Sequence, residues 1–321
     1  MSGKDVSEKM EKMNRKLSTV FTLLLALFFV FKAFPARGIT IEFSHLFSFG
    51  KFGSGKEQFD HPLDVVEDSH EDLYILDSGN YRVQKVDYRG DYITEWGKRG
   101  IREGEFDRPR SLVIDDDDNI YVVDTGNHRI QKFSSDGDFL MEFGGLGQSR
   151  GRFRRPTDLA IDREGNFYVV DAGNRRIQKF DSNWKFVQEW GRFERRGREL
   201  KDPFSIAYAD EGFGYLYVFD REECEVLKFD RTGILKDRWE VLPPGKGYIC
   251  GPMKIRVEPR NYYVYIADTG NGRVVVFNRS GREIGEIEEK LKEPAGLFVN
   301  DSEEVFIVDR ATNKIHKFRR D

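Results

Sequence analysis

The sequence has few of the residues from which metal centres and disulfide frameworks are built. Its 321 residues include only two cysteines and five histidines, so the chain can form at most one internal disulfide bond. Lysine and arginine (52) nearly balance aspartate and glutamate (56), which gives a net charge of -4. A chain without excess positive charge does not attract nucleic acid as a whole. We therefore expect neither a disulfide-rich scaffold nor a nucleic-acid-binding protein.

One long apolar run stands out, from Leu17 to Phe34, behind a polar segment rich in lysine and arginine. Eighteen helical residues span roughly 27 Å, close to the thickness of a hydrocarbon core. The positive charges before the run place the N-terminus in the cytoplasm. We therefore predict a cytoplasmic N-terminus and a single membrane span in residues 1–38. Residues 39–321 then form one domain outside the cytoplasm, periplasmic or extracellular.

A cleaved signal peptide is the alternative for this segment. Cleavage needs small residues just before the cut. Phe34 and Phe31 hold those positions for cuts after Ala36 and Ala33. An uncleaved signal anchor is therefore favoured, and secretion after cleavage is the second hypothesis.

Beyond residue 40 the chain repeats at a period of about 47 residues, which is typical of propeller blades. A proline opens each repeat: Pro62, Pro109, Pro156, Pro203, Pro252 and Pro294. A turn of the form Asp-x-Gly-Asn-x-Arg follows at Asp77–Arg82, Asp124–Arg129, Asp171–Arg176 and Asp268–Arg273, with degenerate versions at Asp220–Glu225 and Asp309–Lys314. Each repeat therefore predicts four short strands separated by polar turns.

These motifs resemble the NHL repeat over residues 41–321. The resemblance implies an all-β fold, a six-bladed β-propeller of four-stranded blades. The sixth repeat ends after its third strand, and Leu46–Gly50 matches the signature of the missing fourth strand. We therefore expect the N-terminal strand to pair with the last blade and close the ring.

The loops divide by charge between the two faces expected of such a propeller. The turns between first and second strands are acidic, and the loops that lead into blades two to four are rich in arginine. Solvated loops of a charged protein would suffice to explain this pattern. Arginine, however, suits contacts with carboxylate or phosphate. We call the following set the basic sector and predict that it binds a partner: Arg99, Arg110, Arg154, Arg155, Arg195 and Arg196.

Residues two positions after each proline are expected to ring the mouth of the central channel. Asp64 and Asp158 are the two carboxylates among them, and they could act as acid and base in a hydrolase or lyase. Peptidylglycine amidating lyases, which are NHL-type propellers, bind zinc through three channel histidines. The five histidines here do not occupy equivalent inner-strand positions, so we predict no metal and no cofactor.

Cys224 and Cys250 fall in neighbouring loops on the same face, and we predict a disulfide bond between them.

The favoured function is a membrane-anchored, non-catalytic binding platform outside the cytoplasm. Its partner is a protein, within a membrane complex to which this chain is an accessory subunit, or an anionic polymer. A secreted hydrolase or lyase at the channel mouth is the alternative. Some cytoplasmic NHL proteins bind RNA, but the export signal argues against that function here.

Overall fold

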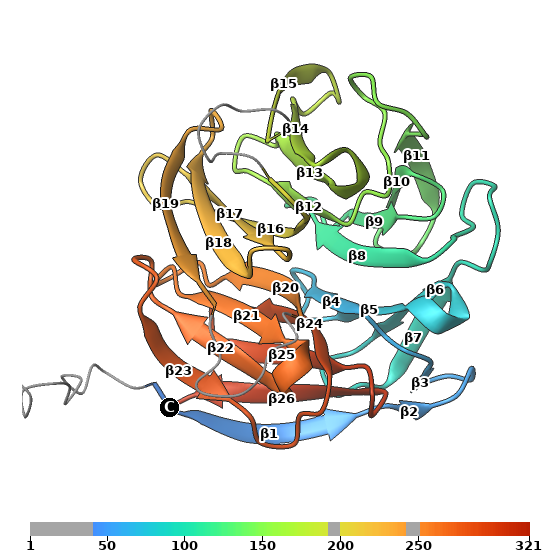
Figure 1. The fold of residues 1–321 in the computed structure, drawn as a ribbon. Coiled ribbons are helices and arrows are strands. Elements are labelled where there is room, and N and C mark those ends of the chain that lie inside the picture. The colour runs from blue at the N-terminus through green and yellow to red at the C-terminus, as the bar shows by residue number, and fades with distance from the viewer. Residues whose placement is uncertain (1–40, 192–199, 242–250) are drawn as a thin grey trace, which may run out of the picture. The chain divides into compact units, whose positions relative to one another are not determined.

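Short strands form because each repeat places β-branched and aromatic residues between turns rich in glycine and aspartate. The computed structural model describes residues 41–191, 200–241 and 251–321. Within these ranges the strands form six four-stranded antiparallel sheets, which are arranged around a central axis (Figure 1). The predicted six-bladed, four-stranded propeller is therefore confirmed.

The blades follow one another along the chain. Blade one contains β4 (Asp64–Glu67), β5 (Leu73–Asp77), β6 (Arg82–Val86) and β7 (Tyr92–Trp96). Blade two contains β8 (Pro109–Ile114), β9 (Ile120–Asp124), β10 (Arg129–Phe133) and β11 (Phe139–Gly144). Blade three contains β12 (Asp158–Ile161), β13 (Phe167–Asp171), β14 (Arg176–Phe180) and β15 (Phe186–Trp190).

Blade four contains β16 (Pro203–Ala209), β17 (Tyr215–Asp220), β18 (Glu225–Asp230) and β19 (Leu235–Glu240). Blade five contains β20 (Pro252–Val257), β21 (Val264–Asp268), β22 (Arg273–Phe277) and β23 (Glu283–Ile287). Blade six contains β24 (Pro294–Val299), β25 (Glu304–Asp309), β26 (Lys314–Arg320) and β1 (Phe43–Phe49). Smaller elements are the parallel pair β2 (Lys51–Phe52) and β3 (Gln58–Phe59), and the 3-10 turns η1 (Ser78–Asn80), η2 (Ala172–Asn174) and η3 (Thr269–Asn271).

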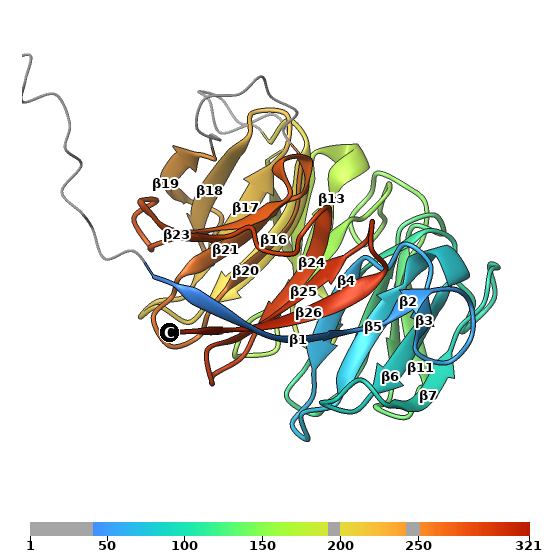
Figure 2. The same ribbon diagram turned by 90° about the horizontal axis from the view of Figure 1, so that it is seen from below.

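The first strand of each blade lies at the axis. These strands contact one another in the order β4, β8, β12, β16, β20, β24 and back to β4. Strand β1 runs antiparallel to β26, with Phe43 opposite Arg320 and Phe49 opposite Ile315. Figure 2 shows the two strands side by side at the rim of the sixth sheet. The first and last described strands of the chain therefore belong to one blade.

Aromatic residues at the ends of the fourth strands pack on glycines of the next blade. Trp96 covers Gly137, and a Cβ at this glycine would lie 2.6 Å from the indole. Gly137 also has a φ of +90°, which L-residues with a side chain rarely adopt. Trp190 covers Gly233 in the same way, and Trp239 covers Gly281. This contact therefore repeats between successive blades and explains the paired aromatic and glycine positions of the sequence.

The predicted membrane span, residues 17–34, lies outside the described residues. Within the described ranges, no helix is both long and apolar enough to cross a bilayer.

Candidate functional site

The Asp-x-Gly-Asn-x-Arg motifs form buried ion pairs that hold each blade together. Arg82 Nε lies 2.8 Å from Asp77 Oδ2. Its Nη2 donates to the carbonyl oxygens of Gly55 and Gln58, which belong to the loop that leads into the blade. Equivalent pairs are Arg129–Asp124 (2.9 Å), Arg176–Asp171 (2.7 Å) and Arg273–Asp268 (3.2 Å). A contact that recurs in four blades has a structural role, and these residues are not a catalytic pair.

The inner strands bring the two channel carboxylates onto one lysine. Lys254 Nζ, on β20, lies 2.6 Å from Asp64 Oδ2 on β4 and 2.8 Å from Asp158 Oδ1 on β12. It also donates to Ser111 Oγ at 2.6 Å. These side chains are almost completely buried. We call Asp64, Ser111, Asp158, Ser205 and Lys254 the central cluster. Its members come from the first strands of blades one to five and meet at the channel axis.

Both carboxylates also accept hydrogen bonds from backbone amides. The backbone N–H of Leu112 donates to Asp64, and that of Ile206 donates to Asp158. Burial would raise the pKa of Asp158, but the charges of Lys254 and Arg256 hold it below its usual range. Asp158 is therefore ionised, and both of its oxygens already accept hydrogen bonds.

The sequence placed Asp64 and Asp158 at the channel mouth, and in the structure both side chains are almost completely buried. Above the central cluster lies a cavity of only about 10 Å³. It has room for at most one water molecule. Its lining residues are Leu63, Arg110, Thr157, Asp158, Phe204, Lys254 and Ala295.

Arginines surround this closed mouth. The Arg110 guanidinium, from β8, lies 5.0 Å from the ring of Phe204 on β16, and that of Arg221 lies 4.4 Å from the same ring. Burial lowers the pKa of Arg110 to about 10, and the charges of four neighbouring arginines add to this shift. We call the five residues the mouth arginine cluster: Arg108, Arg110, Arg155, Arg221 and Arg310. Five arginines therefore gather at the mouth.

Three members of this cluster already have acidic partners, and Arg108 Nη2 lies 3.4 Å from Asp107 Oδ2. Arg221 Nε donates to Asp202 at 2.8 Å, and Arg310 Nε donates to Glu293 at 2.7 Å. In the part of the chain that the structure describes, no acidic side chain pairs with Arg110. Among the described residues, Arg110 and Arg155 are therefore the two members without an acidic partner.

Only part of the predicted basic sector comes together at the mouth. Arg110 and Arg155 belong to the mouth arginine cluster. Arg99 lies instead over Tyr81, 5.5 Å from its ring, and Arg154 is exposed. Arg195 and Arg196 lie outside the described residues.

Sequence reasoning missed Arg221 and Arg310 at the mouth. The sequence did contain a signal for them. In blades four and six an acidic residue precedes the proline, and an arginine follows the aspartate that begins the turn between the second and third strands. The predicted Cys224–Cys250 bond stays a prediction, because Cys250 lies outside the described residues.

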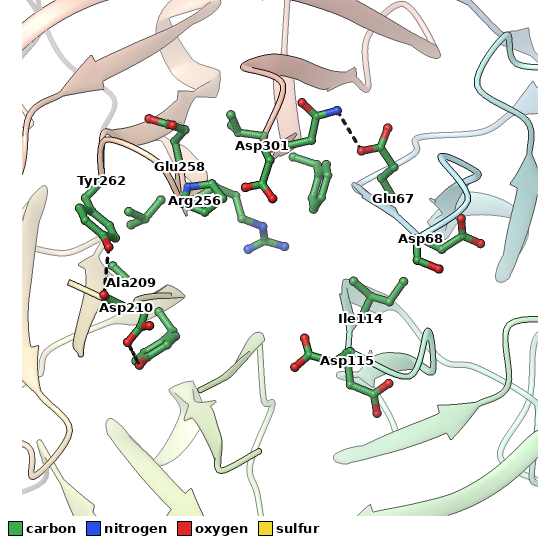
Figure 3. Close-up of a pocket in the computed structure, with 18 of the residues that line it drawn as sticks. Glu67, Asp68, Ile114, Asp115, Ala209, Asp210, Arg256, Glu258, Tyr262 and Asp301 are labelled. Carbon is green, nitrogen blue, oxygen red and sulfur yellow. Dashed lines mark hydrogen bonds between the residues drawn. The ribbon is translucent and has the colours of Figure 1, made fainter. Parts of the chain in front are cut away.

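A second hollow lies at the other end of the channel, among the turns between first and second strands. We call it the acidic pocket; its volume is about 620 Å³. Figure 3 shows its carboxylates around the Arg256 side chain, which extends into the middle of the pocket. The acidic residues that line it are Glu67, Asp68, Asp115, Asp116, Asp118, Asp210, Glu258 and Asp301.

An apolar throat of about 150 Å³ continues from the acidic pocket into the channel. Arg256 lines both spaces. Its Nη2 lies 3.3 Å from the carbonyl oxygen of Leu112 and 3.5 Å from Asp64 Oδ2. Apolar residues of the throat include Val66, Val113, Leu159, Ile206, Val257 and Phe298. The channel thus runs from acidic rim to apolar throat and ends at the central cluster.

Comparison with known proteins identifies the repeat. The NHL repeat family matches residues 106–133 and 153–180, which fall in blades two and three. No curated protein matches the sequence.

The solved structures of similar fold include enzymes. A streptogramin B lyase is 12% identical, with a TM-score of 0.60 over 89% of this chain and 99% of the lyase. A virginiamycin B lyase from Staphylococcus aureus is 13% identical, with a TM-score of 0.60 over 87% of this chain and 99% of that one. A gluconolactonase from Xanthomonas campestris is 16% identical, with a TM-score of 0.64 over 90% and 94% of the two chains. At these identities the likeness concerns the fold alone.

Proposed function

We propose that this chain, which carries NHL repeats in a six-bladed propeller, is a non-catalytic binding platform held outside the cytoplasm by a membrane anchor in residues 17–34. Its function is that of an accessory subunit in a membrane protein complex. The observation that carries the proposal is the pairing of Lys254 with both channel carboxylates.

The pairing argues against acid–base chemistry at the channel. A general acid or base must reach a substrate proton directly or through one water. Asp64 and Asp158 already accept from Lys254 and from backbone amides, and the cavity on the side of the mouth arginine cluster is too small for a substrate. Breaking such a buried pair leaves an uncompensated charge at a cost of roughly 3–5 kcal/mol.

The mouth arginine cluster is the surface best suited to a partner. Arg110 carries an uncompensated charge among the described residues, and Phe204 holds its guanidinium in place. Arginine binds carboxylates and phosphates through paired N–H donors. We therefore propose that the partner presents carboxylate or phosphate groups, as an acidic protein surface does.

Pull-down with the full-length protein in mild detergent tests this surface. The double variant Arg110→Gln with Arg155→Gln should retain at least tenfold less of the partner than the wild type does. The matched control, Arg89→Gln with Lys185→Gln, removes two exposed positive charges in turns between third and fourth strands and should retain it all. Equal retention by both variants would show that the mouth arginines do not contact the partner.

A secreted hydrolase or lyase is the second candidate, because the solved structures of similar fold include a streptogramin B lyase and a gluconolactonase. It would require Lys254 to leave the carboxylates when substrate binds. Turnover of a lactone or a cyclic ester that is abolished by Asp64→Asn, with the fold intact, would favour this candidate over the platform.

A further inference from the structure

The acidic pocket lies on the opposite face from the mouth arginine cluster and has no part in the function proposed above. Strand β8 connects the two sites, since Arg110 lies near its start and Ile114, at its end, lines the pocket. A volume of about 620 Å³ falls within the range of roughly 300–1,000 Å³ that is usual for ligand sites. The contacts of Arg256 and the rim carboxylates define what the pocket can hold.

The Arg256 guanidinium has N–H donors that no described hydrogen bond uses. A guanidinium carries five N–H donors. Among the described residues, those of Arg256 make hydrogen bonds to the carbonyl oxygens of Ile255 (3.2 Å) and Leu112 (3.3 Å) and to Asp64 Oδ2 (3.5 Å). In addition, Nη1 lies 3.9 Å from Asp158 Oδ2. The side chain extends into the middle of the pocket (Figure 3). A carboxylate that enters the pocket therefore finds N–H donors at its inner end.

Three carboxylates at the rim lack a basic partner. Asp68, Asp115 and Asp210 pair with Lys85, Lys132 and Arg163 at 3.0–3.2 Å. Asp118 lies 3.8 Å from His70 Nδ1, and Glu258 lies 3.6 Å from Arg320 Nη1. By contrast, none of the described lysines, arginines or histidines lies within ion-pair distance of the remaining three, Glu67, Asp116 and Asp301. Burial raises the pKa of Glu67 above its usual value, although a hydrogen bond from Asn300 opposes the shift. The rim therefore favours positive charge and repels a simple anion.

Besides the donors of Arg256 and the carboxylates of the rim, the apolar throat sets a third requirement for a ligand. Its volume, about 150 Å³, suits a group the size of benzene. A ligand that satisfies all three regions has a carboxylate, an apolar group beside it and positive charges a few atoms further back. The C-terminal end of a polypeptide with a final apolar residue and preceding lysines or arginines has this arrangement.

We propose that the acidic pocket binds the C-terminal end of a basic peptide segment of a partner protein. The terminal carboxylate pairs with Arg256, the last side chain enters the throat, and the basic residues lie against Glu67, Asp116 and Asp301. A free anion or a plain polyamine satisfies only one of these regions.

Fluorescence polarisation with the full-length protein in detergent tests the proposal. The probe is a fluorescein-labelled peptide, Lys-Arg-Lys-Leu, with a free C-terminal carboxylate, and its comparison is the same peptide as the C-terminal amide. The free acid should bind at least tenfold more tightly, a difference of about 1.4 kcal/mol. Arg256→Lys, which keeps the charge but loses the planar fork, should remove most of that preference.

The rim has its own variant and control. Asp116→Asn with Asp301→Asn should weaken both peptides about equally, because both carry the same basic residues. Asp136→Asn with Asp138→Asn changes two exposed aspartates outside the pocket and should have no effect. Circular dichroism melting confirms that each variant is folded.

Three outcomes would overturn the proposal. Equal affinity for acid and amide would mean that Arg256 does not receive a carboxylate. Displacement of the acid peptide by spermine, with no effect of Arg256→Lys, would mean that the rim is merely a cation-binding surface. Binding of neither peptide up to about 1 mM, a free energy of roughly -4 kcal/mol, would mean that the pocket takes no peptide of this kind.

Discussion

Lys254 and Asp64 come from blades five and one, 190 positions apart in the chain numbering, and meet across the channel axis with Nζ and Oδ2 2.6 Å apart. Asp158 lies on the other side of the same ammonium group at 2.8 Å. The central axis of this propeller is therefore filled by an ion cluster that joins its inner strands. This cluster makes the channel a structural core, and it leaves the two ends of the channel as separate surfaces of opposite charge.

Removal of the central lysine should destabilise the propeller strongly. Lys254→Met leaves two buried carboxylates without a positive partner other than Arg256, so the free energy of unfolding should fall by roughly 3–5 kcal/mol. Urea unfolding followed by tryptophan fluorescence measures the change. Lys236→Met, which breaks a half-exposed pair with Asp230, should cost less than about 1 kcal/mol. A similar small loss for both variants would contradict a stabilising central cluster.

Acid should weaken the sixth blade through His316. Burial lowers the pKa of this side chain from its usual 6.5 to about 4. A folded-state pKa below the unfolded value means that the contribution to stability is complete above pH 6.5 and is lost as the pH falls toward 4. Between about pH 6.5 and pH 5 the loss should be on the order of 2 kcal/mol.

His316→Gln removes this titration, so urea unfolding of the variant should depend less on pH in the same interval. His70→Gln is the matched control, because His70 is exposed in a turn of blade one. The wild-type pH dependence should persist in the control. If it persists in His316→Gln as well, His316 is not its source. Hydrogen exchange should place the acid-sensitive amides on β1 and β26, since His316 lies opposite Ser48.

The repeated arginine should be far more important to stability than the arginine beside it. Arg176 is buried and contacts Asp171, Glu189 and two loop carbonyls, whereas its neighbour Arg175 is exposed. Arg176→Met should lower the free energy of unfolding by roughly 3–5 kcal/mol. Arg175→Met should change it by less than about 0.5 kcal/mol. Comparable effects in the two variants would refute the structural role of the motif.

The predicted Cys224–Cys250 bond can be tested on the intact protein. Mass spectrometry without reductant should give a mass two hydrogens below that of the reduced chain. A bond that closes a loop of about 26 residues contributes roughly 3 kcal/mol, so dithiothreitol should lower the urea midpoint. Alkylation of both thiols without reductant would exclude the bond.

The fold could be predicted from the sequence because each repeat contains the same turn and packing motifs. The proline, the Asp-x-Gly-Asn turn and the aromatic–glycine pairs each specify a turn or a contact within a blade or between neighbours. The central cluster could be predicted only in part. Asp64, Ser111, Asp158, Ser205 and Lys254 were expected in one layer, but the rotamer that carries Lys254 onto both aspartates depends on how the blades are arranged around the axis.

At the two charged ends of the channel, too, the side-chain contacts between blades could not be predicted from the sequence. Arg110 and Arg155 were predicted contacts, but their grouping with Arg221 and Arg310 depends on side chains that converge from four blades. The role of Arg256 was not predicted, because nothing local distinguishes an arginine on β20 from one on the surface. Contacts between individual side chains of different blades cannot be read from a repeat pattern, although the pairing of whole strands can.

The account is tested most directly by extracting the protein from its native membranes in mild detergent, separating the extract on a native gel and identifying the band by mass spectrometry. The account predicts a chain that still contains residues 1–38 and migrates with a defined partner that presents carboxylate or phosphate groups. A soluble chain that begins after Ala36 and migrates alone would contradict it.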